Sequence, residues 1–133
     1  MSTELIEVDT SRGRLADLTA ALHEFCKGRG DGACLVFAPH ATAGLALMEL
    51  GSGSEEDLAV LVDRVLPLDQ PYSHRHGSEG HGRDHLIPVL VSPSITIPVV
   101  EGRPMLGTWQ SLVLVDTNRD NPHRHVRLTW LQG

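Results

Sequence analysis

The sequence predicts an α+β fold in which about seven strands form a β-sandwich with two or three helices. Short apolar segments of strand length recur between turns rich in glycine, proline and serine, and only two longer segments have clear helical spacing. The composition agrees, because 41% hydrophobic residues with only 4% aromatic residues predict an aliphatic core. A chain of 133 residues can bury one such core, so we expect a single domain over residues 1–133.

Three strands and two helices are expected in the first half of the chain. Residues 3–9 alternate imperfectly between polar and apolar side chains and predict a first strand. The apolar residues from Leu15 to Cys26 have helical spacing, and glycines follow them, so a helix is expected there. Acidic residues after Ser54 resemble a capping box and predict the start of a second helix, which ends at a proline. Two further strands are expected over residues 33–38 and 45–50.

The last third of the chain is expected to be mostly strand. Residues 94–100 alternate and predict a strand, and the turn chemistry of residues 101–104 follows them. We therefore expect residues 105–116 to return as the antiparallel partner of that strand. Residues 125–132 alternate again and predict the final strand.

The segment from Asp69 to His85 is polar and rich in histidine. It contains no leucine, isoleucine or valine, so it has almost nothing to bury. A connection this long without apolar residues is typical of a functional loop. Imidazole binds metal ions and transfers protons near neutral pH, so the segment indicates a site for one of these roles. Half of the eight histidines of the chain lie in it, at positions 74, 76, 81 and 85.

The spacing of these histidines alone does not decide between ligand sets. His81 and His85 would share a helical face, but Gly80 and Gly82 disfavour a helix through His81. A short helical turn is expected only from His85 onward. The chain has neither an H-E-x-x-H motif nor paired C-x-x-C motifs, so spacing gives only weak support for a metal.

Charge and cysteine content exclude several classes of function. The net charge is −6, with one lysine and no basic run, so non-specific binding to nucleic acid is not expected. No apolar run is long enough to span a membrane, and the start of the sequence lacks the features of a signal peptide. Cys26 and Cys34 do not form a C-x-x-C motif and lie in apolar segments. We therefore expect a cytoplasmic protein with two reduced, buried thiols.

Five residues outside the histidine-rich segment are candidates for the site. His40 follows the end of an expected strand and is either a ligand or a surface histidine, and Thr42 lies among small residues that leave the backbone open. Glu49 ends an expected apolar strand. It is either a charge at the rim of the sheet, a catalytic acid or base, or a group that orients a histidine. Gln110 begins an apolar segment and needs a polar partner, and Arg124 lies between two histidines and suits an oxyanion.

These motifs, taken in order, resemble one family. They are H-A-T-A-G-L from His40 with the following glutamate, Y-S-H ending at His74, the lone His85, and G-x-x-x-x-G-T-W-Q ending at Gln110. The sequence resembles the YjbQ family, also called UPF0047, whose members are often described as secondary thiamine-phosphate synthases. The resemblance covers nearly the whole chain and implies an α+β fold built on a β-sandwich, a homotrimer, and a histidine site near a subunit boundary. It assigns His40, His74 and His85 as metal ligands.

The activity that the resemblance implies is the joining of a pyrimidine diphosphate to a thiazole phosphate with release of pyrophosphate. A divalent, zinc-like ion on the three histidines would assist, with Glu49 and His85 in catalytic roles and Arg124, Thr42 and Gln110 contacting the phosphorylated substrate. His76 and His81 are reserves for the site. The chain departs from the family pattern at Met48, His81 and Ser92.

Two alternatives to this activity remain open. One is a metal-dependent hydrolase of a small phosphorylated or carbonyl substrate, with a water activated by Glu49. The other is a non-catalytic trimer that binds a metal or an anion.

Overall fold

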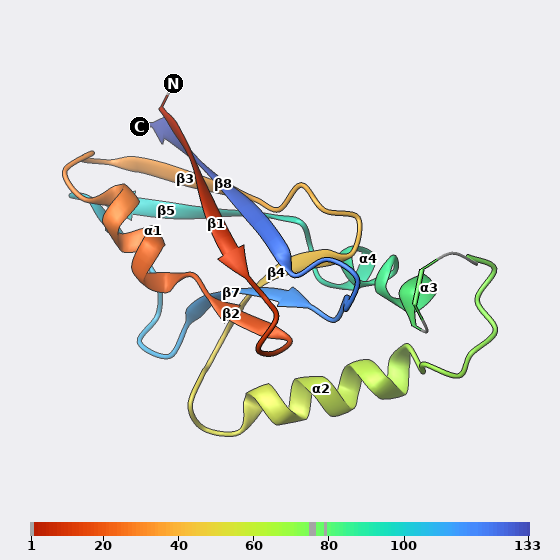
Figure 1. Cartoon of the computed structure of the whole chain (residues 1–133). Helices are drawn as coiled ribbons and strands as arrows, with labels where there is room; N and C mark the ends of the chain where they lie inside the picture. The colour runs from red at the N-terminus through yellow and green to blue at the C-terminus, as the bar shows by residue number, and fades with distance from the viewer. Residues whose placement is uncertain (1, 75–76, 79) are drawn as a thin grey trace.

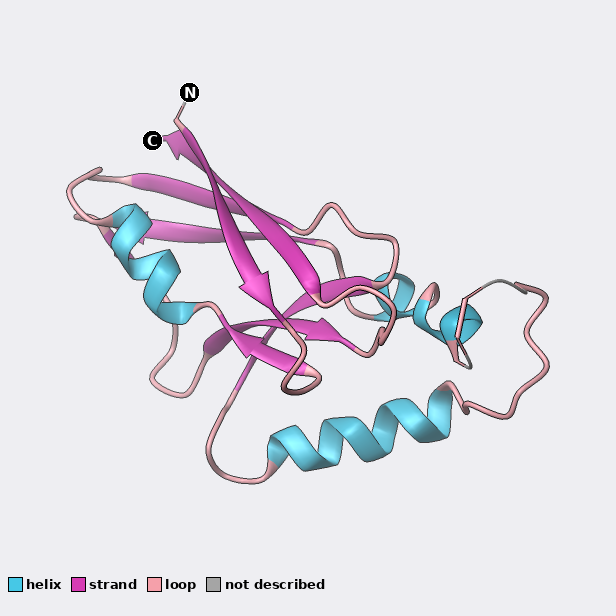
Figure 2. Ribbon diagram, viewed as in Figure 1, coloured by secondary structure: helices cyan, strands magenta, loops and turns pink. Residues whose placement is uncertain are grey.

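Two antiparallel β-sheets pack face to face in the computed structural model, which describes residues 2–74, 77–78 and 80–133 (Figures 1 and 2). The larger sheet has the strand order β1-β8-β3-β5-β6, and the smaller sheet has the order β2-β7-β4. The larger sheet consists of β1 (Thr3–Asp9), β8 (His123–Gln132), β3 (Gly32–Phe37), β5 (Ser94–Val100) and β6 (Arg103–Pro104). The smaller sheet consists of β2 (Leu15–Asp17), β7 (Ser111–Asp116) and β4 (Ala43–Met48). The α+β sandwich predicted from the sequence is confirmed.

The main core lies between the two sheets and is aliphatic, as the composition predicted. Alternate residues of β3 and β8, such as Val36 and Leu128, face Leu45 and Leu114 of the smaller sheet and are almost fully buried. Helix α1 (Thr19–Cys26) contributes its buried side to the same core.

The smaller sheet is covered on its other face by helix α2 (Ser54–Val65), which runs along the outside of the molecule (Figure 1). Val62 of α2 packs with Val113 and Val115 of β7 and with Ile87, which begins helix α4 (Ile87–Leu90). Strand β7 is therefore buried on both faces, and consecutive residues 112–115 are at most 1% exposed. Helix α3 (His81–Asp84) lies between the end of α2 and α4.

Several elements have the bounds that the sequence predicted. Strands β1 and β5 match residues 3–9 and 94–100, and α2 begins at Ser54 as its acidic first turn indicated. Cys26 and Cys34 are free and fully buried, which confirms the prediction for both thiols.

Two predictions about the elements were wrong. Leu15 does not start the first helix but lies in β2, where it pairs with Val115. The helix begins four residues later, where the Asp17 carboxylate accepts the backbone N–H of Thr19 at 3.0 Å. Residues 105–116 do not return as a partner of β5, because β7 pairs with β2 and β4 instead. Its apolar side chains require burial on both faces, and the centre of the smaller sheet provides it.

Within residues 2–74, 77–78 and 80–133, no helix has the length and apolar character needed to cross a membrane.

Candidate metal centre

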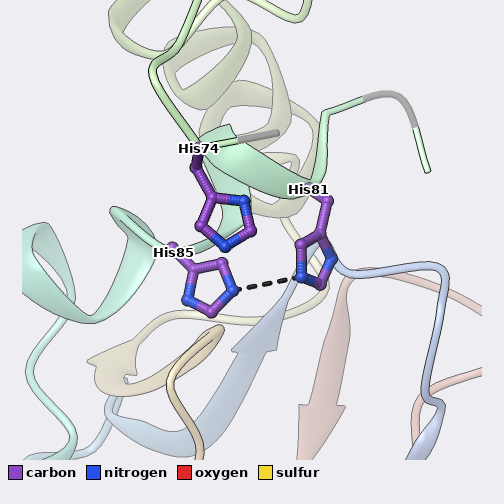
Figure 3. Close-up of side chains that lie close together, drawn as sticks. All are labelled: His74, His81 and His85. Carbon is purple, nitrogen blue, oxygen red and sulfur yellow. Dashed lines mark hydrogen bonds between the residues drawn. The ribbon is translucent and has the colours of Figure 1, made fainter. Parts of the chain in front are cut away.

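Three histidines converge beside α3. His74, His81 and His85 each place one ring nitrogen so that the three nitrogens lie within 4.8 Å of one another (Figure 3). The rings are close as well, with centroids separated by 4.3 Å for His74 and His85 and by 4.7 Å for His81 and His85. All three side chains are partly buried. We call these residues the histidine cluster.

Helix α3 places two members of the cluster on one face. His81 is its first residue, and the backbone N–H of His85 reaches the carbonyl oxygen of His81 at 3.3 Å, so the two rings share a helical face. A helix through His81 was predicted to be improbable because of its glycines, and that prediction was wrong. Gly80 stands before the helix at φ 86°, a left-handed conformation that glycine adopts without strain, and so it begins the turn rather than preventing it.

Gly82 allows His74 to approach α3. A Cβ atom at position 82 would lie 2.9 Å from Cβ of Tyr72 and 3.2 Å from the backbone oxygen of His74. Only a residue without a side chain lets the segment that carries His74 lie against the helix at this distance. The glycine therefore brings the first histidine to the other two.

Asp120, in the loop after β7, determines the tautomer of His81, and Asn118 lies beside the same ring nitrogen. Nδ1 of His81 lies 2.8 Å from Oδ2 of Asp120 and 3.3 Å from Nδ2 of Asn118. Oδ1 of Asn118 accepts the backbone N–H groups of Asp120 and Asn121, so its amide N–H₂ must face His81. The carboxylate is nearer and charged, and it requires a proton on Nδ1. Nε2 of His81 therefore carries the lone pair that a metal ion needs.

The carboxylate of Asp120 is itself held in its charged form. Hydrogen bonds from Ser78, chiefly from its backbone N–H at 3.1 Å, lower the pKa of Asp120, and the nearby His81 lowers it further. A charged partner for a histidine ring is the arrangement that orients metal-binding histidines in many proteins.

The distance between the two helical histidines fits a shared ion. Nε2 of His85 lies 3.1 Å from Nε2 of His81 (Figure 3). Two nitrogens bound at about 2.05 Å to one tetrahedral ion lie about 3.3 Å apart, so these two nitrogens already have about the separation that a shared ion requires. Three nitrogen donors from histidine are a ligand set typical of zinc sites that keep a fourth position open.

Buried ionic contacts fix α3 against the rest of the protein. Arg83 and Asp84 lie between the two histidines in sequence and are each 3% exposed. Asp84 accepts the hydroxyl of Thr117, and Arg83 donates to Asp63 at 3.0 Å and to the backbone oxygen of Leu66 at 3.3 Å. The residues between the histidines thus anchor the helix, while the histidines project from it.

Comparison with known proteins identifies the family. The sequence profile described as UPF0047 protein YjbQ-like matches residues 4–133. A UPF0047 protein of Mycobacterium tuberculosis is 56% identical over 133 residues, which covers 100% of both chains. The chain belongs to the UPF0047 family. YugU, a UPF0047 protein of Bacillus subtilis, is 32% identical over 77% of this chain and 79% of its own length.

Solved structures agree with this assignment. A YbjQ-like protein from Sulfolobus solfataricus superposes with a TM-score of 0.91 at 26% identity, covering 99% of this chain and 97% of its own. A hypothetical protein from Aeropyrum pernix superposes with a TM-score of 0.88 at 32% identity, covering all of both chains. The sandwich described above is therefore the fold of UPF0047 proteins.

In this UPF0047 chain, His40 lies apart from the histidine cluster. Its Nε2 lies 2.9 Å from the backbone oxygen and 3.1 Å from the backbone nitrogen of His125, at the start of β8. Burial, more than any other cause, lowers the pKa of His40, and the Arg124 charge acts in the same direction. Of the predicted ligands the structure brings together His74 and His85, and it adds His81 in place of His40. His76 lies outside the described residues.

Arg124 and Thr42 belong to a buried ionic network beside His40. Arg124 donates to both carboxylate oxygens of Asp116, at 2.7 and 3.0 Å, and to the hydroxyl of Thr42 at 2.7 Å. Asp116 also accepts the hydroxyl of Thr10 at 2.7 Å. The predicted role of Arg124 and Thr42 in contacting an oxyanion does not fit this arrangement, because both side chains already serve a buried carboxylate.

Glu49 and Gln110 lie at the other end of the smaller sheet. At one end of the pairing between β4 and β7, Met48 pairs with Ser111, and Glu49 and Gln110 are the next residues along the chain. At the other end Ala43 pairs with Asp116, and the histidine cluster lies beside this end. Five residue steps along a strand separate the two ends by roughly 17 Å. Within one chain, neither residue joins the histidine cluster, contrary to their predicted roles. Gln110 instead accepts the backbone N–H of Gly107 at 2.8 Å.

Proposed function

We propose that the protein binds a divalent, zinc-like ion at His74, His81 and His85 and uses it in a reaction on a small phosphorylated substrate. The observation that supports this most strongly is the geometry of His81. Its Nδ1 donates to the Asp120 carboxylate at 2.8 Å while its Nε2 faces His85 at 3.1 Å. A histidine that a carboxylate orients through one ring nitrogen, with the other nitrogen directed at a second histidine, is typical of metal ligands.

The reaction that we propose is the joining of a pyrimidine diphosphate to a thiazole phosphate, with release of pyrophosphate, as an activity of the UPF0047 site. Three histidines would hold a zinc-like ion here, and the ion would supply Lewis-acid chemistry that neutralises charge on the departing diphosphate. Asp120 orients His81, and Gly82 permits the approach of His74. In this proposal His85 acts as a ligand, and Glu49 takes no part within one chain.

A second candidate is metal-dependent hydrolysis of a small phosphorylated substrate. The three histidine donors favour it, because a three-histidine set with an open fourth position is typical of catalytic rather than structural zinc sites. The two reactions differ in their requirements: the transferase needs both substrates before pyrophosphate is released, whereas the hydrolase needs one substrate and water.

Metal binding is tested first, by titrating the purified full chain with Zn²⁺ in competition with a chromophoric chelator. We expect one tight site per chain that His81→Ala weakens at least a hundredfold. His23→Ala is the matched control, because His23 lies exposed on α1 and should have no effect. Equal affinity of the wild type and the His81→Ala variant would refute the proposed site.

Turnover is then measured with and without the chelator. Pyrophosphate release that requires both the pyrimidine diphosphate and the thiazole phosphate, and that disappears with His81→Ala, is the expected result. Release of phosphate from one substrate alone supports the hydrolase. Tight metal binding without turnover of either kind supports a protein that only binds the metal.

We also propose that the protein acts as a homotrimer in the cytoplasm. Val60, Leu61 and Val65 of α2 and Val89 and Leu90 near the cluster are more than half exposed, which is unusual for large apolar side chains on neighbouring helices. A second copy of the chain that covers them would explain this exposure, and the two reduced cysteines suit the cytoplasm. Light scattering after gel filtration should give three times the chain mass; a stable monomer would contradict the trimer.

A further inference from the structure

A cavity of about 230 Å³ lies beside the histidine cluster, between the β1–β2 turn, the loop after β7 and α3. It is smaller than the roughly 300 to 1,000 Å³ of pockets that enclose whole small molecules, so it suits one part of a ligand. Every lining residue except Gly13 has a polar or charged side chain. The lining residues are Thr10, Ser11, Gly13, Arg14, Arg83, Asp116, Thr117, Asn118 and Arg119.

The lining carries more positive than negative charge, although the whole chain has a net charge of −6. It includes three arginines, Arg14, Arg83 and Arg119. Asp116 supplies the one carboxylate among the described residues of the lining, and Arg124 and Thr10 already bind both of its oxygens. That carboxylate therefore does not offset the three guanidinium groups.

Carboxylates behind the cavity offset only two of the three arginines. Asp63 pairs with both Arg14 and Arg83, at 3.1 and 3.0 Å, and Asp84 pairs with Arg83 at 3.3 Å. Arg119 forms no ion pair with any described residue and is exposed at the mouth of the cavity. One guanidinium with its five donors thus remains available, next to two that are held rigidly.

Asn118 connects the cavity to the histidine cluster. Its side chain lines the cavity, and its Nδ2 lies 3.3 Å from Nδ1 of His81. Thr117, which also lines the cavity, donates its hydroxyl to Asp84 of α3, the residue before His85. A ligand seated in the cavity would therefore be separated from the cluster by little more than one side chain.

We propose that this cavity binds a phosphate or diphosphate group and so recognises the anionic end of the substrate. Arginine guanidinium groups make paired hydrogen bonds to phosphate oxygens, and Ser11, which carries a hydroxyl, lines the same space. The substrate class follows: a small molecule with a terminal phosphate and a reactive group that reaches past Asn118 to the histidines. This assignment of the substrate's anionic end rests on the proposed function, but anion binding itself is separable from metal binding.

The test uses inorganic pyrophosphate as the probe, titrated calorimetrically into the full chain in chelated, metal-free buffer. Arg119→Gln should weaken pyrophosphate binding about tenfold or more, since hydrogen bonds to charged groups contribute strongly to affinity. Arg103→Gln, at an exposed arginine on β6 outside the cavity, is the matched control and should leave binding unchanged. Because Arg119 is exposed, its replacement should not disturb folding, which circular dichroism checks.

The outcomes separate this proposal from the metal proposal. Pyrophosphate binding that survives His81→Ala and falls with Arg119→Gln, while the Arg119→Gln variant binds Zn²⁺ normally, supports the cavity. Binding lost in the His81→Ala variant but kept in the Arg119→Gln variant places the anion at the histidines and overturns the proposal. Equal losses in the Arg119→Gln and Arg103→Gln variants, or no saturable binding at millimolar pyrophosphate, overturn it as well.

Discussion

Replacing Asp120 by Asn isolates the electrostatic support of the histidine cluster. In the wild type, Nδ1 of His81 lies 2.8 Å from Oδ2 of Asp120. The substitution keeps the size of the side chain and keeps an oxygen that can accept the hydrogen bond from Nδ1. What it removes is the negative charge that favours a proton on Nδ1 and strengthens Nε2 as a ligand. Because Ser78 holds the loop through its backbone N–H, the fold of the loop should persist.

Loss of such a partner typically weakens metal affinity by about ten- to a hundredfold. The Asp120 side chain is 35% exposed, so solvent screens part of its charge and we expect a value near the lower end, about tenfold or 1.4 kcal/mol. Competition with a chelator at fixed ionic strength measures this change. The control is Asp69→Asn, which removes an exposed carboxylate from the histidine-rich segment between α2 and α3.

The reasoning about the tautomer would be refuted by either of two results. One is equal zinc affinity for the Asp120→Asn and Asp69→Asn variants. The other is tighter binding by the Asp120→Asn variant, which would mean that the carboxylate competes with the ion for His81.

Three further results are expected. Gly82→Ala should lower zinc affinity more than Gly13→Ala, because a Cβ at position 82 meets Tyr72 at 2.9 Å whereas position 13 is open; similar titration curves would contradict this. Burial raises the pKa of the Cys34 thiol to about 12, so iodoacetamide should modify it only after denaturation, and rapid labelling of the native chain would count against it. Burial lowers the pKa of His40 below 6.5, so the unfolded state binds more protons and the free energy of unfolding should fall as the pH drops below 6.5. His40→Gln should flatten this dependence between pH 8 and 5. Melting temperatures that fall equally with pH in the wild type and the variant would refute it.

Local patterns in the sequence predicted the elements whose form depends on their own residues. Strands β1 and β5 alternate along their length, and the acidic first turn of α2 sets its start, so each could be predicted without knowing its neighbours. Strand pairing could not be predicted in this way. Residues 105–116 follow a turn, which favours the prediction of a hairpin with β5. The side chains of β7 are buried on both faces, however, and this strand forms the centre of the smaller sheet.

The histidine cluster was predicted in part, and the role of His81 was missed because of the glycines beside it. The polar segment that carries His74 and His85 was identified from composition, whereas His81 was held in reserve because glycines disfavour helices. A glycine inside an ordinary helix lowers its stability by about 1 kcal/mol relative to alanine. Here Gly80 begins α3, and Gly82 lets the segment that carries His74 lie against the helix. A helical spacing of four between two histidines was the signal that could have outweighed that penalty.

The site residues predicted from other segments were wrong for a different reason. His40 and Arg124 are residue types suited to a site, but tertiary contacts with His125 and Asp116 engage them elsewhere. Residue type and position in the chain do not reveal which polar groups a fold has already paired.

Anomalous diffraction at the zinc edge, from crystals grown with Zn²⁺, shows directly whether His74, His81 and His85 bind one metal ion. We expect one strong peak within about 2.0 to 2.1 Å of a ring nitrogen of each of the three histidines. A peak at His40 and His125 instead, or no peak at the histidine cluster at full zinc occupancy in solution, would contradict it.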